Sequence, residues 1–441
     1  MCSLPFKAVV GQARVHLYGH RVSRGPWLLG VQRRRCSGTR EGHRVLQHIA
    51  EHHVRQFRKY SLDDLLELHK LDPTERLRVL VRELHVGISK IIVCLRDLPL
   101  GFSSVGSIQA VIRDYVQDIR DLCQCSPDDE EHMKAAIHAI FIRHRGMLGQ
   151  IATGLREFQS NLSRSFEPFG NFENTDCAHL SDLVPPVRRI ELALDDFFTM
   201  RTTLRLLIAH CIQVNPTQGD DLGKGQGMHA MHQLLWRVPD SLRSAKFGSA
   251  RPQHVGAICM ETRPSLILIE AYQHAKYMCH RDFGRASTLL INDIPSDEFL
   301  SASSFGIDGT HFPYVDIHLY FVFFEVLKNA LLASIRKTSP DKCPPPIRAS
   351  LNSGTSLLME DERSVKIADL GEGISKESVR KVWSYFYSTV TPTSRAGEHG
   401  RLPLAGRGLG LPVSRVLARY FSGEIDLHSI PKRGTDVYIY V

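Results

Sequence analysis

The sequence predicts an α + α/β protein of two packed domains, an N-terminal four-helix bundle followed by an α/β sandwich with helices on one face of a mixed sheet. Its 441 residues, 43% of them hydrophobic, are enough for two cores. Residues 50–215 carry apolar side chains at helical spacing almost throughout. Beyond residue 253, short alternating runs typical of strands are interleaved with helical patterns.

The first 40 residues form a basic leader without acidic side chains. They hold seven Arg, one Lys and no Asp or Glu, a composition typical of a mitochondrial transit peptide that is later cleaved. A merely disordered basic tail is the alternative. Because these eight cations equal the net charge of +8, the rest of the chain is formally neutral. Charge therefore does not support nucleic-acid binding, and we expect no apolar run long enough to span a bilayer.

The bundle is expected over residues 41–215. Apolar periodicity between Pro, Gly and Asp breaks predicts helices at 61–69, 73–95, 105–122, 129–160 and 187–214. A polar, glycine-rich stretch at 216–252 indicates a linker or insertion, and the second domain then covers 253–441. The ten cysteines lack metal-ligand or redox spacing, so we interpret them as reduced thiols, and isolated histidines as core or surface residues.

The most informative helix lies around residues 321–331. Apolar residues at three- and four-residue spacing leave Glu325 and Asn329, one turn apart, on a shared face. Asn329 offers an oxygen ligand to Mg²⁺, and Glu325 can orient or deprotonate a hydroxyl group. Taken alone, this segment fits an ordinary amphipathic helix better, and the two boxes that follow in the chain favour a site instead.

Two glycine-rich boxes follow this helix in the chain. Asp369 ends a predicted strand at 364–369 and precedes Gly371 and Gly373, so a buried carboxylate there could accept a hydrogen bond from an adenine amino group. The second box has glycines at 406, 408 and 410 before a predicted helix at 411–418, where backbone N–H groups can meet phosphates. Further strands are predicted at 288–291, 347–351, 424–429 and 435–441.

The ordered trio of boxes resembles the GHKL ATPase superfamily. Five short segments resemble the sequences of mitochondrial pyruvate dehydrogenase kinases more than those of branched-chain ketoacid dehydrogenase kinases. They are residues 384–389, 403–406, 410–415, 420–421 and 434–436. The resemblance extends more faintly upstream, to about residue 50. It implies a GHKL, or Bergerat-type, sandwich that binds ATP with Mg²⁺ below a lid at 391–405.

The resemblance also implies the residues of the site and their roles. Glu325 would be the catalytic base and Asn329 the Mg²⁺ ligand. The residues implied to bind the nucleotide are Glu325, Lys328, Asn329, Asp369, Gly371, Gly373, Ser388, Thr389, Gly406, Arg407, Gly408, Leu409, Gly410, Leu411 and Thr435.

In the family, the enzyme phosphorylates serine on the α subunit of the decarboxylase component and so inactivates the dehydrogenase complex in the mitochondrial matrix. The bundle docks the lipoyl domain of the dihydrolipoyl acyltransferase core, and the enzyme is a homodimer. The resemblance implies the same substrate, partners and location here.

Some positions depart from the family pattern. Leu370 and Glu372 replace the usual Arg and Gly of an Asp-Arg-Gly-Gly-Gly box, Leu332 stands where the family has Arg, and Phe321 where some members carry His. The sequence ends at Val441 without the tail that members use for cross-subunit packing. Besides a pyruvate dehydrogenase kinase, a branched-chain kinase and a catalytically weak ATP-binding scaffold therefore stay open.

Two other kinase classes are less favoured. A histidine kinase would need a phospho-acceptor helix before the ATP domain, and none is evident. The run from His280 to Gly284 fuses two signatures of ordinary protein kinases that must lie apart, so it is interpreted as structural.

Overall fold

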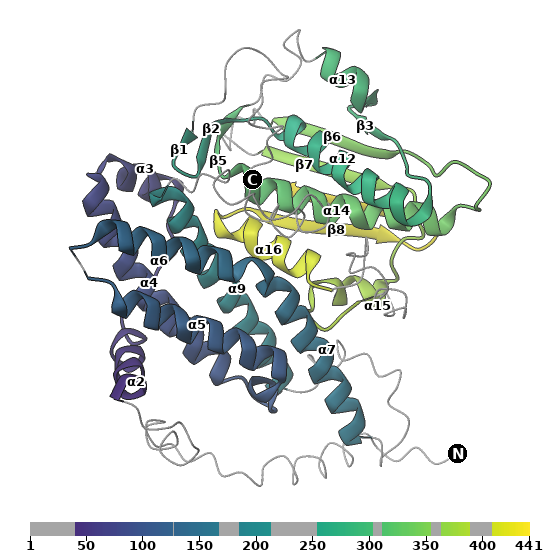
Figure 1. The fold of residues 1–441 in the computed structure, drawn as a ribbon. Coiled ribbons are helices and arrows are strands. Elements are labelled where there is room, and N and C mark those ends of the chain that lie inside the picture. The colour runs from purple at the N-terminus through teal and green to yellow at the C-terminus, as the bar shows by residue number, and fades with distance from the viewer. Residues whose placement is uncertain are drawn as a thin grey trace.

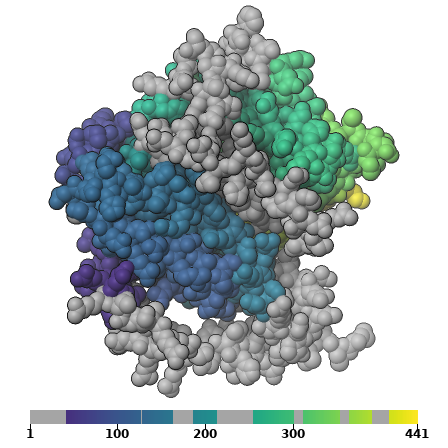
Figure 2. Space-filling view, viewed as in Figure 1, coloured from purple at the N-terminus to yellow at the C-terminus, as the bar shows by residue number. Residues whose placement is uncertain are grey.

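The computed structural model has an all-helical domain packed against an α/β domain (Figure 1). The residues that the structure describes are 40–126, 128–166, 185–212, 254–302, 311–353, 363–388 and 408–441. The predicted leader up to residue 39, the linker at 216–252 and the lid at 391–405 lie outside them. In the space-filling view, purple and blue bundle residues cover the left and centre of the face and green α/β residues its upper right (Figure 2).

The bundle contains helices close to those predicted at 61–69, 73–95, 105–122 and 187–214, together with α2, which was not predicted. The long helices α4, α5, α7 and α9 pack in contacting pairs, α4 with α9, α4 with α5, and α5 with α7, which confirms the predicted bundle. Asp72 caps α4 by accepting a hydrogen bond from the Thr74 amide, with Pro73 at the first helical position. The bundle elements are α2 (Arg40–His52), α3 (Leu62–Lys70), α4 (Pro73–Arg96), η3 (Phe102–Ser104), α5 (Gly106–Gln124), α6 (Glu130–Arg143), η4 (His144–Gly146), α7 (Met147–Phe166) and α9 (Pro185–Cys211).

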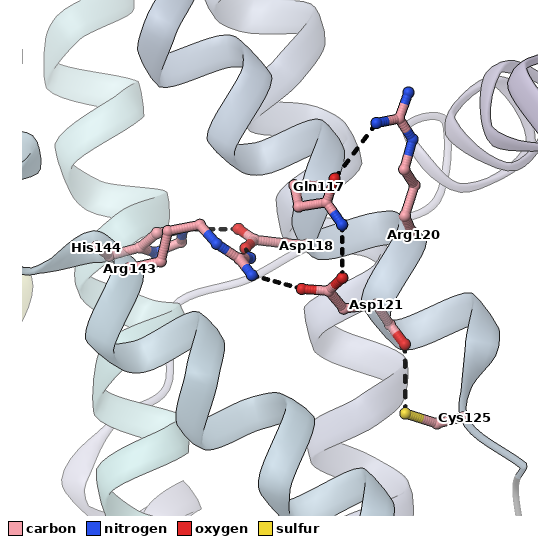
Figure 3. A network of polar contacts seen from close by, with 7 residues as sticks. All are labelled: Gln117, Asp118, Arg120, Asp121, Cys125, Arg143 and His144. Atoms are coloured by element: carbon pink, nitrogen blue, oxygen red, sulfur yellow. Dashed lines mark hydrogen bonds and ion pairs between the residues drawn. The ribbon is translucent and has the colours of Figure 1, made fainter. Parts of the chain in front are cut away.

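The single helix predicted at 129–160 is wrong, because the 3-10 turn η4 divides it into α6 and α7. Arg201 on α9 donates to the backbone carbonyl of His144 (2.9 Å). The His144 ring lies 2.6 Å from Asp118 on α5, and Arg143 pairs with the same carboxylate (Figure 3). Contacts from two other helices thus hold the chain at this turn.

The α/β domain is built on a six-stranded sheet of order β4-β3-β6-β7-β9-β8. Only the β3–β6 pair is parallel, so the predicted mixed sheet is confirmed. Each of the five predicted strands is present, whereas the small sheet β1-β2-β5 and the edge strand β4 were not predicted. The strands are β1 (His254–Val255), β2 (Ile258–Thr262), β3 (Leu289–Ile291), β4 (Ile294–Pro295), β5 (Phe312–Tyr314), β6 (Ile347–Ser353), β7 (Arg363–Asp369), β8 (Glu424–Ile430) and β9 (Gly434–Tyr440).

Three helices lie side by side across this sheet (Figure 1). They are α12 (Pro264–Phe283), α14 (Asp316–Lys337) and α16 (Gly410–Tyr420), with α14 between the other two. Shorter elements complete the domain, namely α13 (Ser296–Ala302), α15 (Lys376–Val379) and η8 (Lys381–Trp383).

Helix α14 is the most apolar helix of the domain. By length and composition alone it could cross a membrane, so the expectation that no run is long enough was wrong. However, 78% of its most apolar window is buried inside the protein, as expected for the central helix of a packed layer.

The two domains meet where the segment after η8 contacts α7 and α9. The Tyr385 hydroxyl donates to Asp195 (2.7 Å), and Ser384 donates to Glu191. Gln159 of α7 donates to the Phe386 carbonyl (2.8 Å). The Phe198 and Tyr385 rings stack with centroids 5.6 Å apart. The segment at 384–386, which precedes the expected lid, is therefore attached to the bundle.

The buried carboxylate of Asp118 provides a test of the bundle core. Asp118 is 0% exposed and neutralises the Arg143 guanidinium beside it. We expect Asp118→Asn to lower the free energy of unfolding by about 3 kcal/mol, because a buried ion pair loses one partner. Denaturant titration measures this loss. The control Asp121→Asn, at the more exposed end of the network, should cost less than about 1 kcal/mol. Equal midpoints for Asp118→Asn and wild type would contradict the assigned role.

Candidate functional site

One face of α14 carries the polar groups of the candidate site. Glu325 and Lys328 form an ion pair of 2.7 Å, and each side chain is 15% exposed. The Lys328 ammonium also lies 5.0 Å from the centre of the Phe324 ring. Asn329, one turn after Glu325, is exposed. The sequence prediction that Glu325 and Asn329 share an accessible face agrees with this burial.

The N-terminus of α16 lies directly against Glu325. A Cβ atom added at Gly410 would overlap Oε2 of Glu325, so a larger residue here would have to push the carboxylate aside. Leu409, at the N-cap, is buried and provides no side-chain cap. The first-turn N–H groups and the positive end of the helix dipole are therefore available to an anion.

At the other end of the site, Asp369 closes β7 with a buried carboxylate. The side chain is 7% exposed and accepts a hydrogen bond from the Gly371 amide (2.8 Å). Burial raises the pKa of Asp369 to about 6, against the opposing effect of backbone hydrogen bonds from Gly371 and Thr435. Such a carboxylate can accept a hydrogen bond from an adenine amino group once its proton is lost.

Helix α14 connects these two ends. A Cβ atom added at Gly371 would lie 2.6 Å from Cβ of Ala333, so the turn after Asp369 packs on that residue. Glu325, Asn329 and Ala333 are spaced by four residues and face one way. They span roughly 12 Å along the helix axis, a length comparable with that of a nucleoside triphosphate.

A second layer of contacts holds the turn after Asp369. Gly373 has a positive φ of 68°, which glycine adopts without strain. Lys337, in the last turn of α14, donates to the carbonyls of Leu370 (2.7 Å) and Lys432 (2.9 Å). The buried Thr435 is the cross-strand neighbour of Asp369, and its hydroxyl lies 2.9 Å from the hydroxyl of Ser429.

The glycine box before α16 is described from Gly408 onward. Gly408 has φ 70°, and a Cβ atom added there would lie 3.6 Å from Cβ of Ser388, so these two predicted site residues are neighbours. Leu411 is half-buried in the first turn of α16. The predicted residues Thr389, Gly406 and Arg407 lie outside the described residues.

Sequence reasoning missed Ala333, Lys337 and Ser429, which contact Asp369, the turn after it, or the neighbouring Thr435. Lys337 had one visible signal, a basic residue in the last turn of the helix that carries Asn329. The departures Phe321 and Leu332 are both buried in the core of the domain.

Asn329 is the candidate Mg²⁺ ligand. Its amide is exposed on the face of α14 that lies between Gly410 and the turn after Asp369. Mg²⁺ takes few protein ligands and completes its shell with phosphate and water oxygens, so a single exposed amide beside an uncapped helix N-terminus fits that ion.

The fold and this arrangement define a GHKL-type ATP-binding domain. Residues 315–441 match the family model described as histidine kinase-, DNA gyrase B-, and HSP90-like ATPase. Residues 59–259 match the model described as mitochondrial branched-chain alpha-ketoacid dehydrogenase kinase.

Curated relatives cover nearly the whole chain. A mitochondrial pyruvate dehydrogenase (acetyl-transferring) kinase of Arabidopsis thaliana is 26% identical over 84% of this chain and 86% of its own length. Isozyme 4 of that kinase from Homo sapiens is 24% identical over 92% of this chain and 87% of its own. The two family models and these relatives together support the family of pyruvate and branched-chain ketoacid dehydrogenase kinases, within the GHKL ATPases, for this chain. It is thus a protein kinase that uses ATP.

The contact between Gly410 and Glu325 generates a prediction. We expect Gly410→Ala to weaken ATP binding at least tenfold, because its methyl group would displace the Glu325 carboxylate and crowd the helix end. Titration of the purified protein with ATP measures this effect. Gly146→Ala is the control, since no atom lies within 4 Å of its added methyl group. Unchanged ATP affinity in Gly410→Ala would show that the helix end does not contribute to the site.

The raised pKa of Asp369 predicts a stability cost. Folding raises this pKa from 3.8 to about 6, so ionised Asp369 destabilises the folded state wherever the pH exceeds 3.8. We expect Asp369→Asn to stabilise the protein at pH 8 by up to about 3 kcal/mol. The gain should shrink as the pH falls below 6 and vanish near pH 4. Denaturant titrations at pH 8 and pH 5 measure it, and a gain independent of pH would contradict the assignment.

Proposed function

We propose that this protein is a mitochondrial serine kinase that uses Mg-ATP to phosphorylate the decarboxylase α subunit of the pyruvate dehydrogenase complex and thereby inactivates it. The names of the curated relatives support the substrate and the mitochondrial location. The observation that carries the proposal is that the Glu325 carboxylate lies against the N-terminus of α16, where Leu409 provides no side-chain cap.

Glu325 is the proposed catalytic base. Its ion pair with Lys328 fixes the carboxylate on the exposed side of α14, next to the helix end that would receive the γ-phosphate. There it accepts the proton of the incoming serine hydroxyl as the oxygen attacks the phosphorus atom. The products are phosphoserine and ADP, and most of the acceleration comes from positioning and charge neutralisation.

The remaining predicted residues are proposed to hold the nucleotide. Asp369 would accept from the adenine amino group, while the turn around it keeps the base in place. Bound at Asn329, Mg²⁺ would supply positive charge to the phosphates. The other proposed binding residues are Lys328, Gly371, Gly373, Ser388, Thr389, Gly406, Arg407, Gly408, Leu409, Gly410, Leu411 and Thr435.

The domain plan belongs to the same proposal. Residues 1–40 would direct the chain to the mitochondrial matrix and then be removed. The bundle at 41–215 would dock the lipoyl domain of the acyltransferase core, and 216–252 would link it to the kinase domain at 253–441. We also propose a homodimer, which light scattering at micromolar concentration tests directly.

Two alternatives are each favoured by one observation. The family model matched by residues 59–259 is described for a branched-chain kinase, which favours the branched-chain complex as substrate. The buried apolar residues Phe321 and Leu332 replace polar family residues on the helix of the catalytic base, which favours a weakly active regulator.

Phosphate transfer from labelled Mg-ATP to each purified dehydrogenase complex tests the proposal. We expect wild type to label serine on the pyruvate dehydrogenase α subunit and Glu325→Gln to lower the rate about 100-fold or more. Glu377→Gln, an exposed carboxylate on α15, is the matched control and should match wild type. Selective labelling of the branched-chain complex would identify that complex as the substrate instead. ATP binding without phosphate transfer would favour the weakly active regulator.

A further inference from the structure

Three helices of the bundle bring two imidazoles and a thiol together, far from the ATP-binding residues in sequence. His48 lies on α2, His85 on α4 and Cys123 on α5. The His48 Nε2 and His85 Nδ1 atoms are 2.9 Å apart, and the Cys123 sulfur lies 3.7 Å from His48 Nδ1. One candidate ligand atom from each residue lies within 4.8 Å of the others.

The 2.9 and 3.7 Å distances involve opposite nitrogens of His48, and one ion can bond to only one of them. The separation that matters for an ion is therefore the 4.8 Å within which one ligand atom from each residue lies. In tetrahedral zinc sites, Zn–N and Zn–S bonds are about 2.1 and 2.3 Å, which places ligand atoms roughly 3.3 to 3.8 Å apart. Small side-chain rotations would therefore bring the three residues onto one ion. Two imidazoles and a thiolate form a borderline-soft donor set that selects Zn²⁺ over Mg²⁺ or Ca²⁺.

Both imidazoles are held in the neutral form that metals require. Burial, with a smaller effect of neighbouring His52, lowers the pKa of His48 to about 4. Burial likewise lowers the pKa of His85 to about 3. Burial raises the pKa of the Cys123 thiol, so a metal ion would have to displace its proton.

The surroundings orient the ligands and leave access from solvent. The His52 ring stacks on His48 with centroids 3.9 Å apart and an interplanar angle of 17°. His52 Nδ1 lies 2.9 Å from the His48 carbonyl oxygen. Cys123 is exposed, so an ion can reach the cluster and a water molecule can complete its coordination.

We propose that His48, His85 and Cys123 form a zinc site that fastens α2 to α4 and α5. The ion bonds to one nitrogen of each imidazole and to the Cys123 thiolate, and the thiol proton passes to solvent. The inference does not depend on the proposed kinase substrate. Because α2 supplies a ligand, occupancy of the site couples the first described helix to the body of the bundle.

Titration of the full chain, without a polyhistidine tag, with Zn²⁺ alone tests the proposal. We expect one equivalent to bind tightly, with release of about one proton measured by calorimetry in two buffers. Zn²⁺ should also raise the melting temperature and slow amide hydrogen exchange in α2. With Co²⁺ as a spectroscopic substitute, a thiolate-to-metal charge-transfer band should appear in the near ultraviolet.

Cys123→Ser and His85→Gln should each abolish tight binding of the one equivalent of Zn²⁺. Cys123→Ser should also remove the thiolate-to-Co²⁺ charge-transfer band, because it removes the sulfur. The matched controls are Cys343→Ser, another exposed free cysteine, and His43→Gln, an exposed histidine on α2. Both should bind as wild type does. Circular dichroism confirms that each variant is folded. Binding that survives in Cys123→Ser and His85→Gln, or no tight equivalent in wild type, would overturn the proposal.

Discussion

The α/β domain depends on one constraint, namely that α14 is buried on nearly all sides and keeps a single polar face. Its apolar residues pack against α12, α16 and the sheet, so the helix can neither rotate nor slide without exposing them. That rigidity fixes Glu325, Asn329 and Ala333 in a line. The N-terminus of α16 and the turn after Asp369, the proposed sites for phosphate and adenine, are thereby held at a constant separation.

Asp369 illustrates how such a site carries a cost in the free protein. Its carboxylate is buried at the end of a central strand, where desolvation opposes ionisation. The backbone amide of Gly371 relieves this cost only in part. A bound base that donates a hydrogen bond would relieve this cost further, so the preformed acceptor would favour binding of the base.

Local patterns predicted most of the fold. Periodicity predicted the five principal strands and the polar face of α14 to within a few residues. The glycine boxes were placed by the strand predicted before one of them and the helix predicted after the other. The break in the helix at His144 does not follow from local sequence, because Arg201, 57 residues away, donates a hydrogen bond to the His144 carbonyl oxygen. The strands β1 and β5 are too short to show alternation.

The candidate site was predicted to the same extent. Glu325, Asn329, Asp369 and Gly410 follow from motifs, but Lys337 acts through two carbonyls distant in sequence. The grouping of His48, His85 and Cys123 has no local spacing at all, since each residue lies on a different helix. Cysteine and histidine counts along the chain therefore gave no sign of it.

The attachment of residues 384–386 to α9 has a consequence for how the protein can be divided. Tyr385 and Phe386 are buried against the bundle, and Tyr420 of α16 donates to Thr203 of α9. A fragment beginning at residue 254 would expose these rings and leave Asp195 and Glu191 behind. The α/β domain is therefore not an independently stable unit, and we expect neither domain to stay folded and soluble when it is expressed without the other.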